Sequence, residues 1–252
     1  MKWSYGPIGV KDAFTLVNLL GCVAGIYFVL EGRLETAGLA LLLGYVFGDS
    51  LDGLVARLTG TSNRFGGALD SETDHLTQAV VPGIIVFAVY RNGGHAFLGF
   101  VLLAALVACG TFRHALFAVA KMDDPLMYCG LPRTVSGFAS LSFVLSSWFV
   151  AHSGRAYVIG GCLIPALALA GLLPIPYLTH RGARRMQTYV KVFIVGVFVT
   201  PAIALFTLRD LMFDLLFVWM MAYALGAWIP LHAHERKAFF ERYRRWVIDV
   251  SR

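Results

Sequence analysis

Charge is scarce in this sequence. Asp, Glu, Lys and Arg make up 14% of its 252 residues, whereas hydrophobic residues make up 58% and the mean hydropathy is +0.70. Soluble domains average about 25% charged and about 45–50% apolar residues, so this composition argues against a soluble domain. The net charge of +6 would suggest nucleic acid in a soluble protein. Here anionic lipid headgroups and loop topology explain it, and we expect no nucleic-acid partner.

Cysteine is also scarce, and the few cysteines are scattered. The chain has four, with no CxxC pair among them: Cys22, Cys109, Cys129 and Cys162. Their isolation argues against a disulfide framework and against a cysteine-rich zinc site. Three of them lie in apolar runs, where a free cysteine behaves as a small hydrophobic residue.

Long apolar runs are what the sequence has in place of charge. A helix that crosses a bilayer takes about 17–25 mainly apolar residues. Eight runs meet this length: 13–31, 36–58, 68–91, 94–119, 131–152, 156–178, 190–208 and 211–231. The sequence therefore predicts an all-α integral membrane protein, a bundle of about eight transmembrane helices.

Basic residues alternate between the connecting segments. With a cytoplasmic N-terminus, 17 of the 21 Lys and Arg fall on the cytoplasmic side, and the other four are Arg33, Arg91, Arg155 and Arg209. The positive-inside rule then places both termini in the cytoplasm and the protein in the inner (cytoplasmic) membrane. The basic loop at 179–191 divides a six-helix core (1–185) from an additional helix pair with a basic cytoplasmic tail (186–252).

The tail, residues 234–252, mixes basic and aromatic residues at helical spacing. One interpretation is a solvated cytoplasmic tail. The other is an interfacial helix with its aromatic side chains toward lipid and its arginines near phosphates. Those aromatic residues are Phe239, Phe240, Tyr243 and Trp246.

Carboxylates gather in the segment "GDSLDGLVARLTGTSNRFGGALDSETD" (48–74), beside apolar runs. Asp49 and Asp52 are three residues apart and Asp70 and Asp74 four, so each pair shares one face of a helix. The acids could simply cap helices in a wet loop. If they converge, however, their mutual repulsion is relieved by one or two divalent cations. Oxygen ligands favour Mg²⁺, Mn²⁺ or Ca²⁺ over zinc.

Small residues accompany these acids. Gly53, Ala56 and Gly66 leave the helix surfaces bare, which lets another helix or a flat polar ligand approach the backbone. Arg57, one turn beyond Asp52, is placed to pair with a phosphate. Metals, an arginine and a cytoplasmic face together indicate phosphoryl chemistry on a lipid-linked substrate.

The pattern D-x-x-D-G-x-x-A-R, eight residues, then G-x-x-x-D-x-x-x-D, running from Asp49 to Asp74, resembles the signature of the CDP-alcohol phosphotransferases. The resemblance implies a binuclear site with four carboxylate ligands: Asp49, Asp52, Asp70 and Asp74. It also implies a binding site for the CDP-lipid: Gly53, Ala56, Arg57 and Gly66. Asp74 would deprotonate the acceptor alcohol, whose oxygen attacks the lipid-side phosphorus and releases CMP.

Within that family the chain most resembles bacterial and archaeal phosphatidylserine synthases. The stretches that carry the likeness are 14–26, 60–74, 109–117, 130–138 and 172–185. The resemblance implies transfer of a phosphatidyl group from CDP-diacylglycerol, or a related CDP-lipid, to L-serine, in a homodimer whose site faces the cytoplasm. The metals implied are Mg²⁺ or Mn²⁺, with Ca²⁺ as an alternative.

The chain departs from those synthases just after Asp74, where it reads "HLTQAVVPG". Four residues are candidates for binding the acceptor: Arg113, Arg133, His75 and Gln78. An arginine would suit the serine carboxylate. Inositol phosphate, glycerol phosphate or an amino alcohol remain alternative acceptors. A cation transporter that uses the same acids is the rival class, and an inactive relative that serves in assembly is a third possibility.

Overall fold

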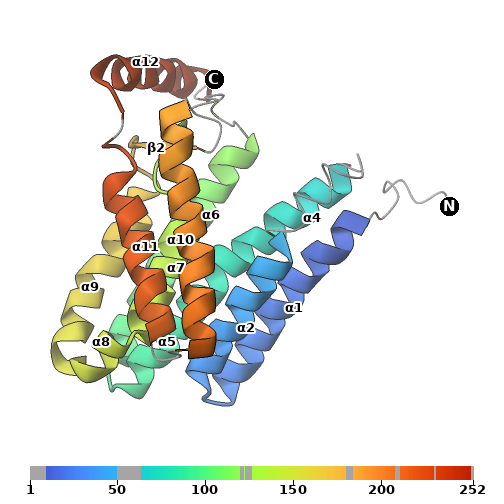
Figure 1. Ribbon diagram of the computed structural model, residues 1–252, viewed down its shortest axis with the longest axis vertical. Coiled ribbons are helices and arrows are strands. Elements are labelled where there is room, and N and C mark those ends of the chain that lie inside the picture. The colour runs from blue at the N-terminus through green and yellow to red at the C-terminus, as the bar shows by residue number, and fades with distance from the viewer. Residues whose placement is uncertain are drawn as a thin grey trace. The chain divides into compact units, whose positions relative to one another are not determined.

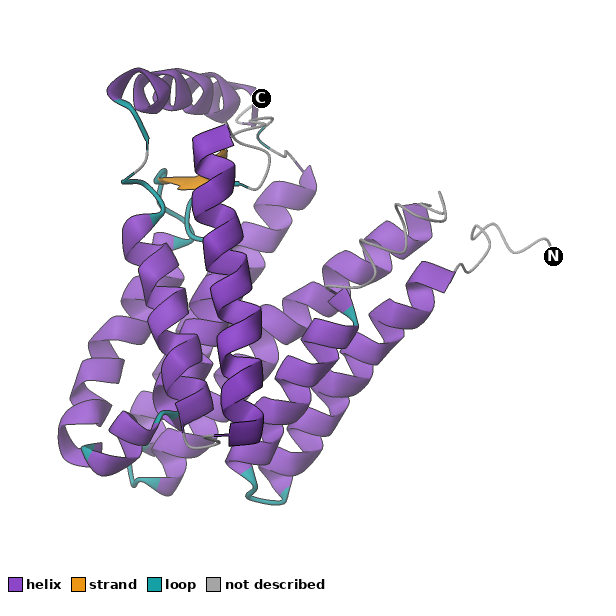
Figure 2. Ribbon diagram, in the orientation of Figure 1, coloured by secondary structure: helices purple, strands orange, loops and turns teal. Residues whose placement is uncertain are grey.

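The computed structural model describes residues 10–49, 64–119, 122, 127–179, 184–207, 211–229 and 231–250. These residues are almost entirely helical, and the helices and one short strand pair are drawn in Figure 2. The chain forms two compact units, Met1–Leu103 and Ala104–Arg252. Asp52, Gly53, Ala56 and Arg57, four of the predicted site residues, lie outside the described residues.

The first unit contains the elements α1 (Val10–Leu30), α2 (Leu34–Phe47), α4 (Arg64–His75), η1 (Leu76–Val80), α5 (Val81–Asn92) and the start of α6 (Ala96–Val119). α1 and α2 form an antiparallel hairpin (Figure 1). Gly32, with φ +74°, makes the turn between them. The two helices touch at Gly21 and Gly44, where a Cβ added to Gly21 would lie 2.6 Å from the Gly44 Cα.

α4, η1 and α5 run on without a break as one helical segment. η1 is a single turn of π-helix, in which the backbone N–H of Val81 bonds to the carbonyl of Leu76, five residues earlier. The segment matches the third predicted span, 68–91. Its apolar half is buried, with Ile85, Val86 and Tyr90 fully covered. The acids therefore occupy the polar half of a helix that continues into the apolar core.

The second unit contains the end of α6, β1 (Met127–Cys129), α7 (Arg133–Leu145), α8 (Ser147–Ala151), α9 (Ser153–Ala170), β2 (Pro176–Leu178), α10 (Arg184–Thr207), α11 (Met212–Gly226) and α12 (Ala233–Val250). α7 packs against both α9 and α11, and it is buried from Val135 to Leu145. Ser140 and Ser142 are tolerated there because each hydroxyl donates to a carbonyl four residues earlier.

Two predicted spans are wrong in detail. The fifth, 131–152, is two helices, because α7 ends before Ser146, whose hydroxyl accepts from the Phe149 N–H and begins α8. The sixth, 156–178, ends as a helix at Ala170. Residues 176–178 instead form β2, antiparallel to β1, with Met127 opposite Leu178.

Among the described residues, four helical stretches are long and apolar enough to cross a membrane: Asp12–Leu30, Ala96–Val119, Ser153–Ala170 and Thr188–Thr207. α2 and α11 are apolar but shorter. Their surfaces carry many exposed large hydrophobic side chains, such as Leu20, Phe97 and Phe206, which suits contact with lipid tails rather than water. The chain is an α-helical integral membrane protein.

The C-terminal stretch is a helix, α12, and within the second unit it lies across the ends of α10 and α11 (Figure 1). The expectation that its aromatic side chains face lipid is wrong for three of the four. Phe239 is fully buried in a hydrophobic cluster with residues of β1, β2 and α10, and Tyr243 and Trp246 pack against that cluster. Only Phe240 is exposed among them, at 43%. The strand pair therefore provides the apolar platform on which α12 rests.

Candidate active site

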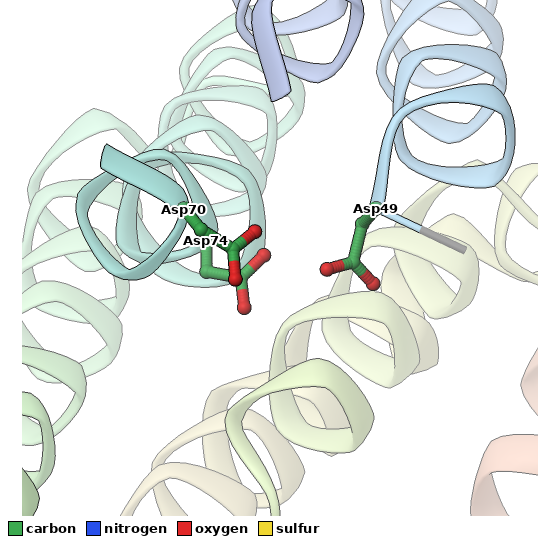
Figure 3. Close-up of side chains that lie close together, drawn as sticks. All are labelled: Asp49, Asp70 and Asp74. Carbon is green, nitrogen blue, oxygen red and sulfur yellow. The ribbon is translucent and has the colours of Figure 1, made fainter. Parts of the chain in front are cut away.

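Three of the four predicted carboxylate ligands lie together in the first unit. Asp49 follows directly after α2, and Asp70 and Asp74 are one turn apart on α4. Figure 3 shows the Asp70 and Asp74 side chains projecting toward that of Asp49. One carboxylate oxygen from each lies within 4.8 Å of the others, and all three residues are half-buried. The spacing seen in the sequence thus brings two separate segments to one point.

The donor set fits a divalent cation. It consists of oxygen atoms alone, which hard ions such as Mg²⁺ and Mn²⁺ prefer. Oδ1 of Asp70 and Oδ1 of Asp74 are inaccessible to solvent, and three like charges so close together repel one another. A cation between them would bring opposite charge to a place where water is partly excluded. Glu72, on another face of α4, is exposed and lies outside this group.

Small residues and the π turn frame the carboxylates. Gly66 is buried one turn before Asp70, and Gly48, immediately before Asp49, packs directly on α1. His75 is half-buried at the end of α4, and Gln78 is buried within η1. Both acceptor-binding candidates of this unit therefore lie within four residues of Asp74.

Arg113, the acceptor-binding candidate on α6, is bonded to the main chain of the second unit. Its Nη1 donates to the carbonyls of Cys129, at 2.7 Å, and of Gly171. Its Nη2 donates to Gly130, at 3.3 Å. The guanidinium also lies over the Phe117 ring, 4.7 Å from its centroid. Arg113 thus joins the loop after β1 to the end of α9, a structural role that the sequence pattern did not indicate.

The two remaining polar features near Arg113 are Arg133 and Cys129. Arg133 is the first residue of α7 and is half-buried. Burial raises the pKa of the Cys129 thiol to about 11, and the nearby Arg113 charge opposes that rise. Cys129 is therefore a neutral thiol at physiological pH, as expected for a cysteine that serves as a small hydrophobic residue.

Two residues that the sequence analysis did not single out also lie beside the acids. Thr77, in η1, is fully buried, and its hydroxyl lies 3.0 Å from Oδ1 of Asn18 on α1. The Cys22 thiol is 3.0 Å from the same hydroxyl. No local pattern points to this contact, because its partners are 55 and 59 residues apart in the chain.

Comparison with known proteins gives relatives with one theme. Archaetidylserine synthase of Methanothermobacter thermautotrophicus is 28% identical over 144 residues, 56% of this chain and 60% of the relative. A CDP-diacylglycerol–serine O-phosphatidyltransferase of Methanocaldococcus jannaschii is 27% identical over 160 residues, 62% and 71% of the two chains. The enzyme of that name from Saccharomyces cerevisiae is 35% identical over 123 residues, 46% and 43%. The chain thus spans from under half to about 70% of these relatives.

The family of CDP-alcohol phosphatidyltransferases matches residues 10–173. This range is well over half of the chain, and it includes the three converging aspartates and both arms that carry them. The chain belongs to the CDP-alcohol phosphatidyltransferase family.

Proposed function

We propose that the protein transfers a phosphatidyl group from CDP-diacylglycerol, or a related CDP-lipid, to the hydroxyl of L-serine and releases CMP. One observation carries the proposal: carboxylate oxygens of Asp49, Asp70 and Asp74 lie within 4.8 Å of one another, at the positions of the family signature. Relatives named for serine transfer support the acceptor.

In the proposed site four carboxylates hold the metal: Asp49, Asp52, Asp70 and Asp74. Two bound ions, Mg²⁺ or Mn²⁺, would neutralise the diphosphate of the CDP-lipid and stabilise the departing CMP. Four residues bind the CDP-lipid itself: Gly53, Ala56, Arg57 and Gly66. The buried position of Gly66, one turn before Asp70, suits a surface on which a flat base lies close to the backbone.

Asp74 is proposed as the general base. It accepts the proton of the serine hydroxyl while that oxygen forms a bond to the lipid-side phosphorus. The bond from this phosphorus to the CMP oxygen then breaks, so CMP leaves with the electron pair. The half-buried setting of Asp74 beside two further carboxylates favours proton uptake, because like charges nearby disfavour its ionised form.

For the acceptor we favour Arg133, His75 and Gln78 as binding residues. A serine carboxylate needs a cationic partner. The three main-chain carbonyls that Arg113 already holds argue for a structural role there and leave Arg133 as the better candidate. Inositol phosphate, glycerol phosphate and amino alcohols are the alternative acceptors.

We further propose eight spans with both termini in the cytoplasm and the site facing the cytoplasm. The support is the alternation of basic residues together with four helices long enough to cross and two shorter apolar ones. A six-helix core (1–185), an added C-terminal part (186–252) and a homodimer belong to the same proposal.

The test is an acceptor panel with purified protein, CDP-diacylglycerol and Mg²⁺ or Mn²⁺, in which CMP release is measured. Serine is expected to give the highest rate. Asp74→Asn should abolish turnover, while Glu72→Gln, an acid-to-amide change on the exposed face of the same helix, should not. CMP release with another acceptor alone would overturn serine. Metal flux into liposomes without CMP release would favour a transporter instead.

A further inference from the structure

α1 carries buried polar side chains to which the proposed reaction gives no task. Asn18 is 1% exposed and lies in a helix that is otherwise apolar enough to cross a membrane. A buried amide is costly unless its hydrogen bonds are made. Its surroundings are therefore informative: Asn18 lies between the two segments that carry the carboxylates.

On one side Asn18 meets the end of α2. A Cβ added to Gly48 would lie 2.5 Å from both the Cβ and the backbone N of Asn18. Contacts this short do not occur between real atoms, so only glycine allows α2 to end against α1 at this distance. The residue that follows is Asp49. Asn18 is thus the surface on which the Asp49 segment rests.

On the other side Asn18 meets the π turn. The Thr77 hydroxyl lies 3.0 Å from Asn18 Oδ1 and 3.0 Å from the carbonyl of Thr73. One hydroxyl has one proton, so it donates to one of these oxygens at a time, and the two acceptors share it. Thr73 directly precedes Asp74. The hydroxyl therefore joins α1 to the backbone that holds Asp74.

The π turn makes this contact possible. Such turns are rare and concentrate at functional sites. η1 begins two residues after Asp74, and its wider turn shifts the side chains that follow relative to those of α4. Thr77 is fully buried as a result of its position against α1.

We propose that Asn18 is a positioning residue that fixes the separation of the two carboxylate arms, Gly48–Asp49 on one side and Asp74–Thr77 on the other. The inference rests on the metal site of the proposed function. Three carboxylates within 4.8 Å push the arms apart, so something other than the acids must hold them at the spacing that a cation needs. Asn18 touches both arms.

The size of the effect follows from what supporting contacts contribute at metal sites. Removing a partner that orients the ligands commonly weakens metal affinity by about 10–100-fold. Thr77→Val keeps the shape of the side chain and removes the hydroxyl, so we expect the Mn²⁺ dissociation constant to rise by about 10-fold. Thr77→Ser keeps the hydroxyl and should stay near the wild-type value.

The experiment measures Mn²⁺ binding by electron paramagnetic resonance, in detergent, without substrates. Ser140→Ala is the matched control, since the Ser140 hydroxyl is equally buried and donates to a carbonyl four residues earlier, yet lies on α7. It should bind Mn²⁺ like the wild type. Asn18→Ser, too short to reach Thr77, should weaken binding as Thr77→Val does. Combining the two changes should add little, because they break one contact.

Wild-type affinity in a folded Thr77→Val protein would overturn the proposal. If that protein does not fold, wild-type affinity in Asn18→Ser overturns it equally. Equal losses in Ser140→Ala would also do so, because the effect would then follow any lost hydroxyl. Mn²⁺ binding by a wild-type protein that releases no CMP refutes the proposed function and leaves this inference standing. A wild-type protein that binds no Mn²⁺ refutes both.

Discussion

Neutralising Asp70 should stabilise the metal-free protein and destabilise it relative to wild type once metal is added. Two charges 4.8 Å apart, the limit seen among the three carboxylates, repel by about 0.9 kcal/mol in water and about 3.5 kcal/mol at an effective dielectric constant of about 20. Asp70 takes part in two of the three pairs. Since the residues are half-buried, Asp70→Asn relieves at least about 2 kcal/mol at low salt.

The assay is thermal melting in detergent, with a chelator and with Mn²⁺. A gain of about 2 kcal/mol raises the melting temperature by about 4–8 °C in a chain of this size. Metal at 100 times its dissociation constant stabilises a binding protein by about 2.7 kcal/mol. The order of the two proteins should therefore invert: Asp70→Asn melts higher in chelator, and the wild type melts higher in Mn²⁺.

Glu72→Gln is the control for this inversion, because it also removes a negative charge from α4 but on the exposed face. It should melt like the wild type under both conditions. The reasoning fails if Asp70→Asn melts at or below the wild type in chelator, or if Mn²⁺ leaves the wild type unchanged. Either result would mean that the three carboxylates do not act as one charged cluster.

Two further substitutions test the packing around the site. Gly21→Ala places a Cβ 2.6 Å from the Gly44 Cα; α1 and α2 must part by about 1 Å, at a cost of about 1–3 kcal/mol in melting experiments. Gly154→Ala, with open space around it, should cost nothing. Arg113→Lys cannot hold three carbonyls with the same geometry. It should lower the melting temperature and leave the KM for serine unchanged, whereas a raised KM with unchanged stability would restore acceptor binding to Arg113.

Hydropathy predicted the helical architecture because an apolar run of sufficient length has few other ways to satisfy its backbone in lipid. It could not predict where a run divides. Ser146 and the segment after Ala170 are apolar in context, yet one caps a new helix and the other leads to a strand. β1 and β2 pair across almost 50 residues of chain. Such pairing depends on the tertiary fold and leaves little trace in local composition.

Spacing predicted the aspartates because three and four residues are distances that a helix itself converts into one face. Asp70 and Asp74 needed only α4 to come together, and Asp49 needed the hairpin of α1 and α2. Asn18 and Thr77 had no such local signal. Their contact joins α1 to η1 and depends on a π turn, which periodicity does not anticipate.

Buried polarity has two explanations in this molecule, and hydrogen bonding separates them. Asp214, on α11, accepts from the N–H and hydroxyl of Ser147 at 2.9 and 3.0 Å, and Arg113 donates to three carbonyls. Each meets groups that complement it, so each is explained by the fold. Asp49, Asp70 and Asp74 meet one another. Like charges brought together raise the energy of the folded chain, so the arrangement is favourable only with a cation that the chain binds from outside.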